Sequence, residues 1–255
     1  MCYNYFLKKI IPCPDIKKYK KFLFIGAHAC DIEKGAGATA CKLAKEGKEV
    51  KFVICTDSVG LSSNDNQDTA KSIHEKESLA SATVLGIKEV EFLQFKSFSQ
   101  YSCAELRDEL IKVIIQFKPD VVLIDDITTF NEINMDDRIV SKTAEEVILY
   151  TTNKLLMNDI GEESVRIRAI AYYNTLNPNY YINIIGFLEQ KIHSVLIHNS
   201  LLPINNTSRI SYIRSYKSLI KLTAYSAGFK SAKLQAESFR VVSITSTHNM
   251  PQINY

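Results

Sequence analysis

The stretch KFLFIGAHACDIEKGAGATACKLAK, residues 21–45, decides the fold of this chain. It starts with an apolar run from Phe22 to Ala27, which is typical of a buried strand. A polar turn at 28–33 follows, and then a helical pattern that Gly47 is expected to end. This order places metal-capable side chains at the carboxyl end of a strand. Open α/β sheets carry their binding sites at that edge.

The chain up to residue 157 repeats this alternation of strand and helix. Its patterns predict strands at 49–55, 89–93 and 120–124, and helices at 68–85, 103–117 and 136–157. Such alternation indicates an α/β fold, in which a mostly parallel sheet has helices on both faces. The polar loops 28–37, 56–67 and 125–137 would then meet at one edge of the sheet, where we expect the site.

The C-terminal third is less regular. Its patterns predict extra strands at 165–173, 180–185 and 239–244, and extra helices at 186–199 and 212–228. A chain of 255 residues is most simply one domain. We expect an N-terminal arm at 1–20, a single domain at 21–246 and a loose tail at 247–255.

Composition narrows the class of partner. The 31 basic and 28 acidic residues leave a net charge of +3, and no dense basic run appears, so we expect neither nucleic acid nor a membrane as partner. No apolar run is long enough to span a bilayer. The six cysteines are scattered without a CxxC pair, which is typical of reduced thiols in a cytoplasmic protein. The sequence does not determine the oligomeric state.

His28 and Asp31 carry the sharpest local signal. Imidazole and carboxylate both bind zinc, and two such ligands three residues apart on a strand-end turn can converge on one ion. The alternative is a buried histidine beside a helix-capping aspartate. Two other acidic pairs have similar alternatives: Asp136–Asp137 can simply stabilise a helix N-terminus, and Asp125–Asp126 can be solvated acids at a strand end.

The remaining polar candidates have ordinary structural alternatives too. His74 lies on a helix expected at the surface, and His198 lies beside an apolar helix face where a hydrogen-bonded core histidine is the default. Cys30 is either a thiolate nucleophile or a small buried hydrophobe.

Taken together, these segments resemble the PIG-L/LmbE family of zinc-dependent de-N-acetylases, which remove an acetyl group from N-acetylglucosaminyl or related amino-sugar substrates. The family's opening motif, (P/A)HPDDxExGxGGT followed by KLAxxGxxV, corresponds to AHACDIEKGAGATACKLAKEGKEV. Later family motifs correspond in order to VKFVICTDSVG, EKESLASATVLGIKEVEFL, DVVLIDDITTFNEINMDDR, YYNTLNP, LEQK, HNSL and AESFR. The resemblance implies the Rossmann-like LmbE fold, a zinc cofactor and a small-molecule substrate.

The resemblance also implies roles for individual residues. The zinc ligands would be His28, Asp31 and Asp137. Asp136 corresponds to the family's orienting aspartate, and Asn134 to a histidine tied to protonating the leaving amine or steadying the oxyanion. Cys30 stands where the family has the general base, an aspartate that activates the attacking water.

Three further residues are expected to bind substrate. Two other positions differ from the residues that the family has there. The substrate-binding candidates are Asp57, His74 and His198, with His74 at the place of a family arginine. Leu201 replaces a glutamine of the HxSQ motif, and Ala227 replaces an arginine near the end of the chain. The substrate-reading positions are therefore among those that changed.

Two hypotheses from different classes follow. In the first, the protein is a zinc-dependent amide hydrolase with remodelled catalytic residues, acting on an N-acyl amino sugar or a related metabolite. In the second, it is a catalytically inactive relative that binds or scaffolds. A third variant gives Cys30 covalent chemistry, but we see no partner histidine for it beyond His28. A thiol is a poor base at neutral pH, and a thiolate would bind the metal itself.

Overall fold

The structure, a computed structural model, describes residues 13–61, 66–128, 134–203 and 205–244. Its centre is a seven-stranded sheet in the order β3-β2-β1-β4-β5-β7-β6. The strands are β1 (Lys21–Gly26), β2 (Glu49–Thr56), β3 (Glu89–Phe95), β4 (Val121–Asp125), β5 (Ala169–Tyr173), β6 (Tyr180–Asn183) and β7 (Ala236–Ser243). Strands β1 to β5 are parallel to one another, whereas β7 runs antiparallel to both β5 and β6. The expected α/β fold with a mostly parallel sheet is confirmed.

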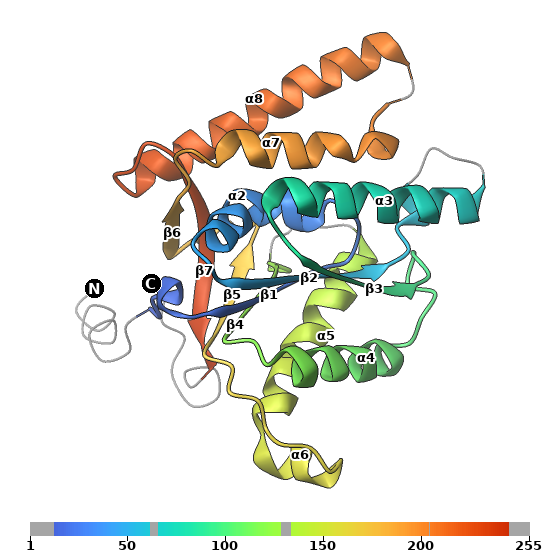
Figure 1. Ribbon diagram of the computed structural model, residues 1–255, viewed down its shortest axis with the longest axis vertical. Helices are drawn as coiled ribbons and strands as arrows, with labels where there is room; N and C mark the ends of the chain where they lie inside the picture. Colours follow the sequence, from blue (N-terminus) through green and yellow to red (C-terminus); the bar gives the residue numbers. More distant parts are fainter. Residues whose placement is uncertain (1–12, 62–65, 129–133, 204, 245–255) are drawn as a thin grey trace.

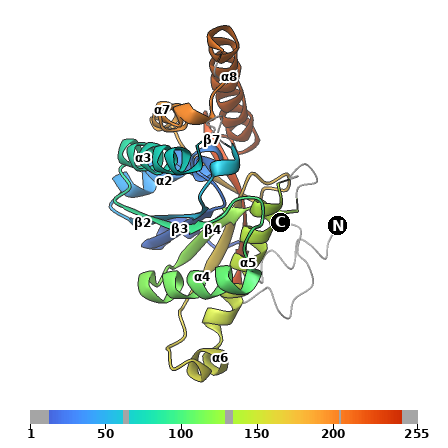
Figure 2. The same ribbon diagram turned by 90° about the vertical axis from the view of Figure 1, so that its right-hand side faces the viewer.

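Helices cover both faces of this sheet (Figures 1 and 2). One face carries α2 (Asp31–Lys45), α3 (Gln67–Leu85), α7 (Leu188–Ile197) and α8 (Asn206–Lys230), and the other carries α4 (Cys103–Phe117) and α5 (Met135–Thr152). The short α6 (Lys154–Asp159) extends beyond α5, and α8 extends beyond the opposite layer (Figure 2). None of the described helices is long and apolar enough to cross a membrane.

The sheet separates two apolar cores. Alternate strand residues explain the separation, since successive side chains point to opposite faces. Phe22 and Phe24 of β1 pack with α2, α3 and α7, whereas Leu23 and Ile25 pack with α4 and α5. The near-continuous apolar strands are therefore the consequence of a sheet buried on both faces.

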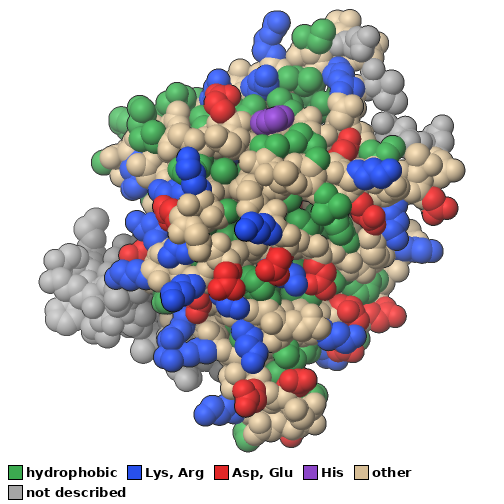
Figure 3. All heavy atoms as spheres, viewed as in Figure 1, with side chains coloured by type: hydrophobic (Ala, Val, Ile, Leu, Met, Phe, Trp, Pro, Cys, Tyr) green, Lys and Arg blue, Asp and Glu red, His purple; other side chains and the backbone are tan. Residues whose placement is uncertain are grey.

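Figure 3 shows basic and acidic side chains interspersed over the visible face. The described cysteines, Cys13, Cys30, Cys41, Cys55 and Cys103, are free thiols.

Some element boundaries were predicted wrongly. The single helix expected at 136–157 is two helices, because Asn153 has extended backbone angles and its side chain accepts the amide protons of Leu155 and Leu156 at the start of α6. Strand β5 begins at Ala169 rather than at residue 165, and α8 begins at Asn206 rather than at residue 212. Ile16 of the expected arm is fully buried, whereas residues 1–12 and the predicted tail at 247–255 lie outside the described residues.

Candidate metal and active site

The turn after β1 folds the Asp31 carboxylate back onto His28. The backbone N–H of His28 donates to Asp31 Oδ2 at 2.7 Å. Cys30 makes this turn possible with a left-handed backbone at φ 77°, and α2 starts at the next residue. Gly35 then lies so close to the Tyr173 ring that any side chain there would overlap it. These contacts explain why the turn after β1 is polar and why residue 35 of the opening motif is glycine.

Three side chains meet in a cluster that suits a metal ion. His28 Nδ1 lies 3.2 Å from Asp31 Oδ2 and 3.6 Å from Asp137 Oδ1, and one ligand atom from each residue lies within 4.8 Å of the others. Ligand atoms placed about 2.0–2.1 Å from zinc in a tetrahedron are about 3.4 Å apart. The donor set and its spacing therefore fit zinc with three protein ligands and a fourth position open.

Asp136 fixes the other side of the imidazole. Its Oδ2 lies 3.1 Å from His28 Nε2, so Nδ1 faces the two ligand carboxylates. The loop between β3 and α4 holds Asp136 in turn, with hydrogen bonds from the backbone N–H groups of Phe98 at 2.8 Å and Ser99 at 2.7 Å and from the Tyr101 hydroxyl at 3.2 Å. A carboxylate that orients a metal-binding histidine in this way is a common supporting feature of zinc sites.

The charges of the cluster follow from these contacts. Burial lowers the pKa of His28, but hydrogen bonds with Asp136, Asp137 and Asp31 outweigh it and raise the pKa to about 12. Burial raises the pKa of Asp136, but its bonds to His28 and to two backbone amides lower it to about 2. The imidazole thus carries a proton that a metal ion would displace, because only the neutral ring nitrogen can be a ligand.

Cys30 is not one of the three clustered residues. Its thiol is 1% exposed and lies 3.9 Å from the carbonyl oxygen of Val195 in α7. Burial raises the pKa of the thiol well above its ordinary value, so the thiolate does not form at neutral pH. Asn134 is similarly occupied, since its side-chain oxygen accepts the backbone N–H of Asp136 and caps α5.

The three substrate-binding candidates lie around the cluster but serve internal contacts. Asp57 accepts hydrogen bonds from the backbone and hydroxyl of Ser97. His198 is buried and pairs with Glu33 at 3.1 Å, leaving its Nδ1 without a hydrogen bond in the described part of the chain. His74, expected at the surface, is only 2% exposed. Ser200, in the turn that follows α7, covers it, and His74 Nδ1 lies 3.1 Å from the Ser200 hydroxyl.

Asp125 belongs to the site and was not among the predicted site residues. It ends β4, is half-buried and accepts a hydrogen bond from Asn174 Nδ2 at 3.0 Å. Burial and the charges of Asp31 and Asp137 raise its pKa to about 7, although the Asn174 bond lowers it. Its neighbour Asp126 is different, because Arg240 binds both of its oxygens at 3.0 Å. The sequence shows that Asp125 and Asp126 are adjacent acids at a strand end, but only the fold shows that their environments differ.

Comparison with known proteins places this geometry in a family. The PIG-L family, described as GlcNAc-PI de-N-acetylase, matches residues 23–148, which contain the metal cluster. The diacetylchitobiose deacetylase of Thermococcus kodakarensis is 29% identical over 189 residues, covering 72% of this chain and 71% of that protein.

Solved structures agree with the sequence matches. The N,N'-diacetylchitobiose deacetylase of Pyrococcus horikoshii superposes with a TM-score of 0.85 at 26% identity, covering 98% of this chain and 95% of that one. The 4-carboxy-2-hydroxymuconate hydratase GalB of Pseudomonas putida shares the fold, with a TM-score of 0.72 at 17% identity over 91% of this chain and 100% of that one. From the matched sequence and the whole-chain superposition on a deacetylase, the chain belongs to the PIG-L/LmbE-like family of de-N-acetylases.

Proposed function

We propose that this protein is a zinc-dependent amide hydrolase that removes an N-acetyl or other N-acyl group from an amino sugar or a related small metabolite. The observation that carries the proposal is the His28–Asp31–Asp137 cluster, in which His28 Nδ1 lies 3.2 Å from Asp31 Oδ2 and 3.6 Å from Asp137 Oδ1. The diacetylchitobiose deacetylases that resemble the chain support the amide of an N-acetylated sugar as the substrate.

The cluster would hold the metal, and Asp136 would keep His28 in place for it. Zinc bound there would polarise the scissile carbonyl and make a nearby water more acidic. Two carboxylates and one imidazole make this donor set more negative than one with two imidazoles. We therefore expect weaker polarisation of the carbonyl than in a site of that second kind.

The proton of the attacking water needs an acceptor, and we assign that role to Asp125. The other carboxylates near the cluster are already committed: Asp136 to His28, Glu33 to His198, and Asp126 to Arg240. Within the described residues Asp125 forms no ion pair; it accepts a hydrogen bond from the Asn174 amide and ends β4 at the edge of the sheet where the ligands gather. After taking the proton, the same carboxyl group can donate it to the leaving amine, so that water and amide give a carboxylic acid and an amine.

The alternative is an inactive relative that binds or scaffolds. The replacements that favour it are Cys30, Asn134 and Asp137, and the first two side chains are turned to structural contacts. The GalB hydratase has the same fold and a different reaction, so the fold alone does not identify the activity. The two hypotheses differ in whether an amide is cleaved.

The test is hydrolysis itself. Zinc-loaded protein is incubated with N,N'-diacetylchitobiose and N-acetylglucosamine, and released acetate and primary amine are both measured. The proposal expects equal amounts of the two products, a loss of about 10²- to 10⁴-fold in kcat for Asp125→Asn with zinc retained, and no activity for Asp31→Ala. Stoichiometric zinc without cleavage of any N-acetyl amino sugar would leave the binding hypothesis in place of the enzyme.

A further inference from the structure

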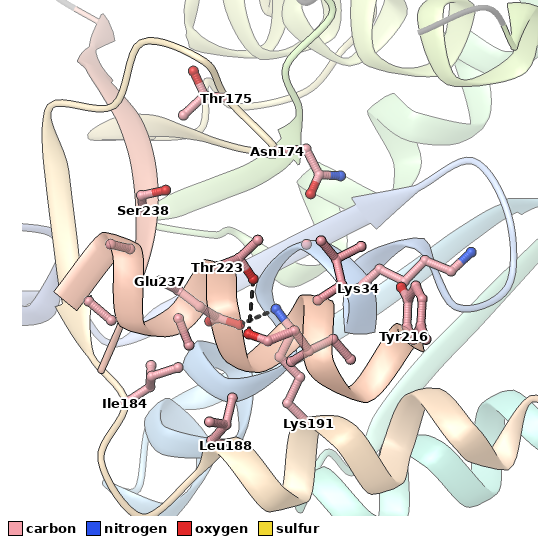
Figure 4. Close-up of a pocket in the computed structure, with 16 residues that line it drawn as sticks. Lys34, Asn174, Thr175, Ile184, Leu188, Lys191, Tyr216, Thr223, Glu237 and Ser238 are labelled. Atoms are coloured by element: carbon pink, nitrogen blue, oxygen red, sulfur yellow. Dashed lines mark hydrogen bonds and ion pairs between the residues drawn. The ribbon is translucent and has the colours of Figure 1, made fainter. Parts of the chain in front are cut away.

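A cavity of about 420 Å³ opens beside the His28–Asp31–Asp137 cluster. Its walls come from the start of α2, the turn after β5, and helices α7 and α8 (Figure 4). Asn174 connects it to the site, because this residue lines the cavity and also donates to Asp125. A sugar whose amide lies at the cluster would therefore have room for its remaining atoms here.

One part of the cavity is closed by an internal ion pair. Lys191 Nζ lies 2.6 Å from Glu237 Oε1, and both side chains are less than one-tenth exposed. The Glu237 carboxylate also accepts the backbone N–H groups of Ala38 at 3.2 Å and Thr39 at 2.7 Å, where Ala36 interrupts α2 with non-helical angles. These charges satisfy each other, so this pair supports the wall and leaves no free charge for a ligand.

The opposite part carries a charge of a different kind. Lys34 lies one helical turn after Asp31, and Figure 4 shows its side chain beside Tyr216, away from the Lys191–Glu237 pair. Within the described residues, Lys34 forms no ion pair and the Tyr216 hydroxyl forms no hydrogen bond. Burial lowers the pKa of Lys34, but nearby groups, the Asp31 carboxylate among them, raise it more strongly, so the ammonium group is charged.

A half-buried lysine whose side chain lies beside a tyrosine in the cavity wall is suited to an anionic oxygen. Lysine binds carboxylate and phosphate as a compact point charge, and a charged hydrogen bond is stronger in a partly buried site than in water. A neutral sugar would offer this ammonium group no counter-charge of its own. The chemistry of the cavity therefore differs between neutral and anionic ligands.

We propose that the cavity binds an N-acylated amino sugar that carries a carboxylate or phosphate, and that Lys34 and Tyr216 hold that anionic group. This inference rests on the proposed function, because it places the amide of the same molecule at the metal cluster. Lys34 and Tyr216 would then select the substrate without taking part in bond cleavage.

The test measures binding of defined probes by calorimetry to the zinc-loaded protein. The probes are N-acetylglucosamine 1-phosphate, N-acetylglucosamine 6-phosphate and N-acetylmuramic acid, with N-acetylglucosamine as the neutral reference. At least one anionic probe should bind about ten- to a hundredfold more tightly than the reference, and the probe that does so distinguishes phosphate from carboxylate. Lys34→Gln should abolish this preference and Lys34→Arg should keep most of it. Lys88→Gln removes the same charge from an exposed position before β3 and should leave the preference unchanged.

Each result decides the inference. Equal affinity for neutral and anionic probes, or a preference that survives Lys34→Gln, would overturn it. Cleavage of neutral N-acetyl sugars together with no charge preference would reject the inference while leaving the amidase proposal standing. A Lys34-dependent preference without zinc or cleavage would reject the amidase and keep the anion site. No binding of any anionic probe would overturn the inference.

Discussion

His28 and Asp136 are joined through Nε2 and Oδ2 at 3.1 Å, and this contact aims His28 Nδ1 at Asp31 and Asp137. The pair connects α5 and the loop after β3 to the turn after β1. The metal cluster therefore depends on a side chain that is not itself a ligand. That relationship gives the first prediction.

Asp136→Asn should weaken zinc binding by about 10- to 100-fold, because the amide lacks the charge that orients the imidazole and raises its basicity. The measurement is competition for zinc with a chelating dye. Asp68→Asn is the matched control, since Asp68 is an exposed aspartate in the first turn of α3. Equal zinc affinity for the wild type and Asp136→Asn would show that the contact has no role in the metal site.

Cys30→Asp should rescue activity in an Asp125→Asn background. Aspartate tolerates the left-handed backbone found at this position, where the resembling family has its general base. We expect kcat for amine release to rise by about 10²-fold or more over the single Asp125→Asn variant. Cys30→Asn has the same shape without a base and should give no rescue; similar rates for both double variants would contradict the assigned need for a carboxylate.

Glu237→Gln should destabilise the protein strongly. Lys191 would keep its buried charge without a partner, and losses of about 3–5 kcal/mol in the free energy of unfolding are usual for such a change. The double variant Glu237→Gln with Lys191→Met should recover much of the loss in urea unfolding. Glu109→Gln is the control, because its pair with Lys112 is exposed and should matter little. A small effect of Glu237→Gln would mean that the kinked α2 does not need this pair.

The pair of Asp126 and Arg240 should make stability depend on pH in the acid range. Burial raises the pKa of Asp126, but hydrogen bonds from Arg240, Thr128 and Thr175 lower it from 3.8 to about 2. The folded pKa is thus below the unfolded one, so the stabilisation is present above pH 4 and is lost as pH falls toward 2.

As the pH falls from 4 to 2, the free energy of unfolding of the wild type should decrease by about 2 kcal/mol more than that of the double variant Asp126→Asn with Arg240→Met. Urea unfolding at several pH values measures this difference. Parallel pH profiles of the two proteins would contradict the stabilising ion pair.

The sequence was sufficient to predict the sheet's core and the cluster's membership. The apolar runs located β1, β2 and β4, and the opening motif located His28 and Asp31. These signals are local, because they depend on periodicity and on spacing within one turn. The resemblance supplied Asp137, which no local spacing connects to His28.

Other features depended on contacts between distant segments. Asp125 and Asp126 are adjacent, yet one meets Asn174 and the other meets Arg240, so their different environments arise only when β4 lies beside β5 and its neighbour β7. His74 is buried because Ser200, 126 residues away, covers its helix face. The place of Lys34 in a cavity likewise required α7 and α8 to line the same space as the start of α2.

The most direct test of the account is the zinc content of the purified protein. It is measured by elemental analysis after zinc is added and the excess removed, for the wild type, Asp31→Ala and Asp137→Ala. The account predicts about one zinc ion per wild-type chain and a loss of that zinc in both variants. A wild-type protein that retains no zinc would contradict the metal site, and the chain would then have to be treated as a binding relative of the deacetylases.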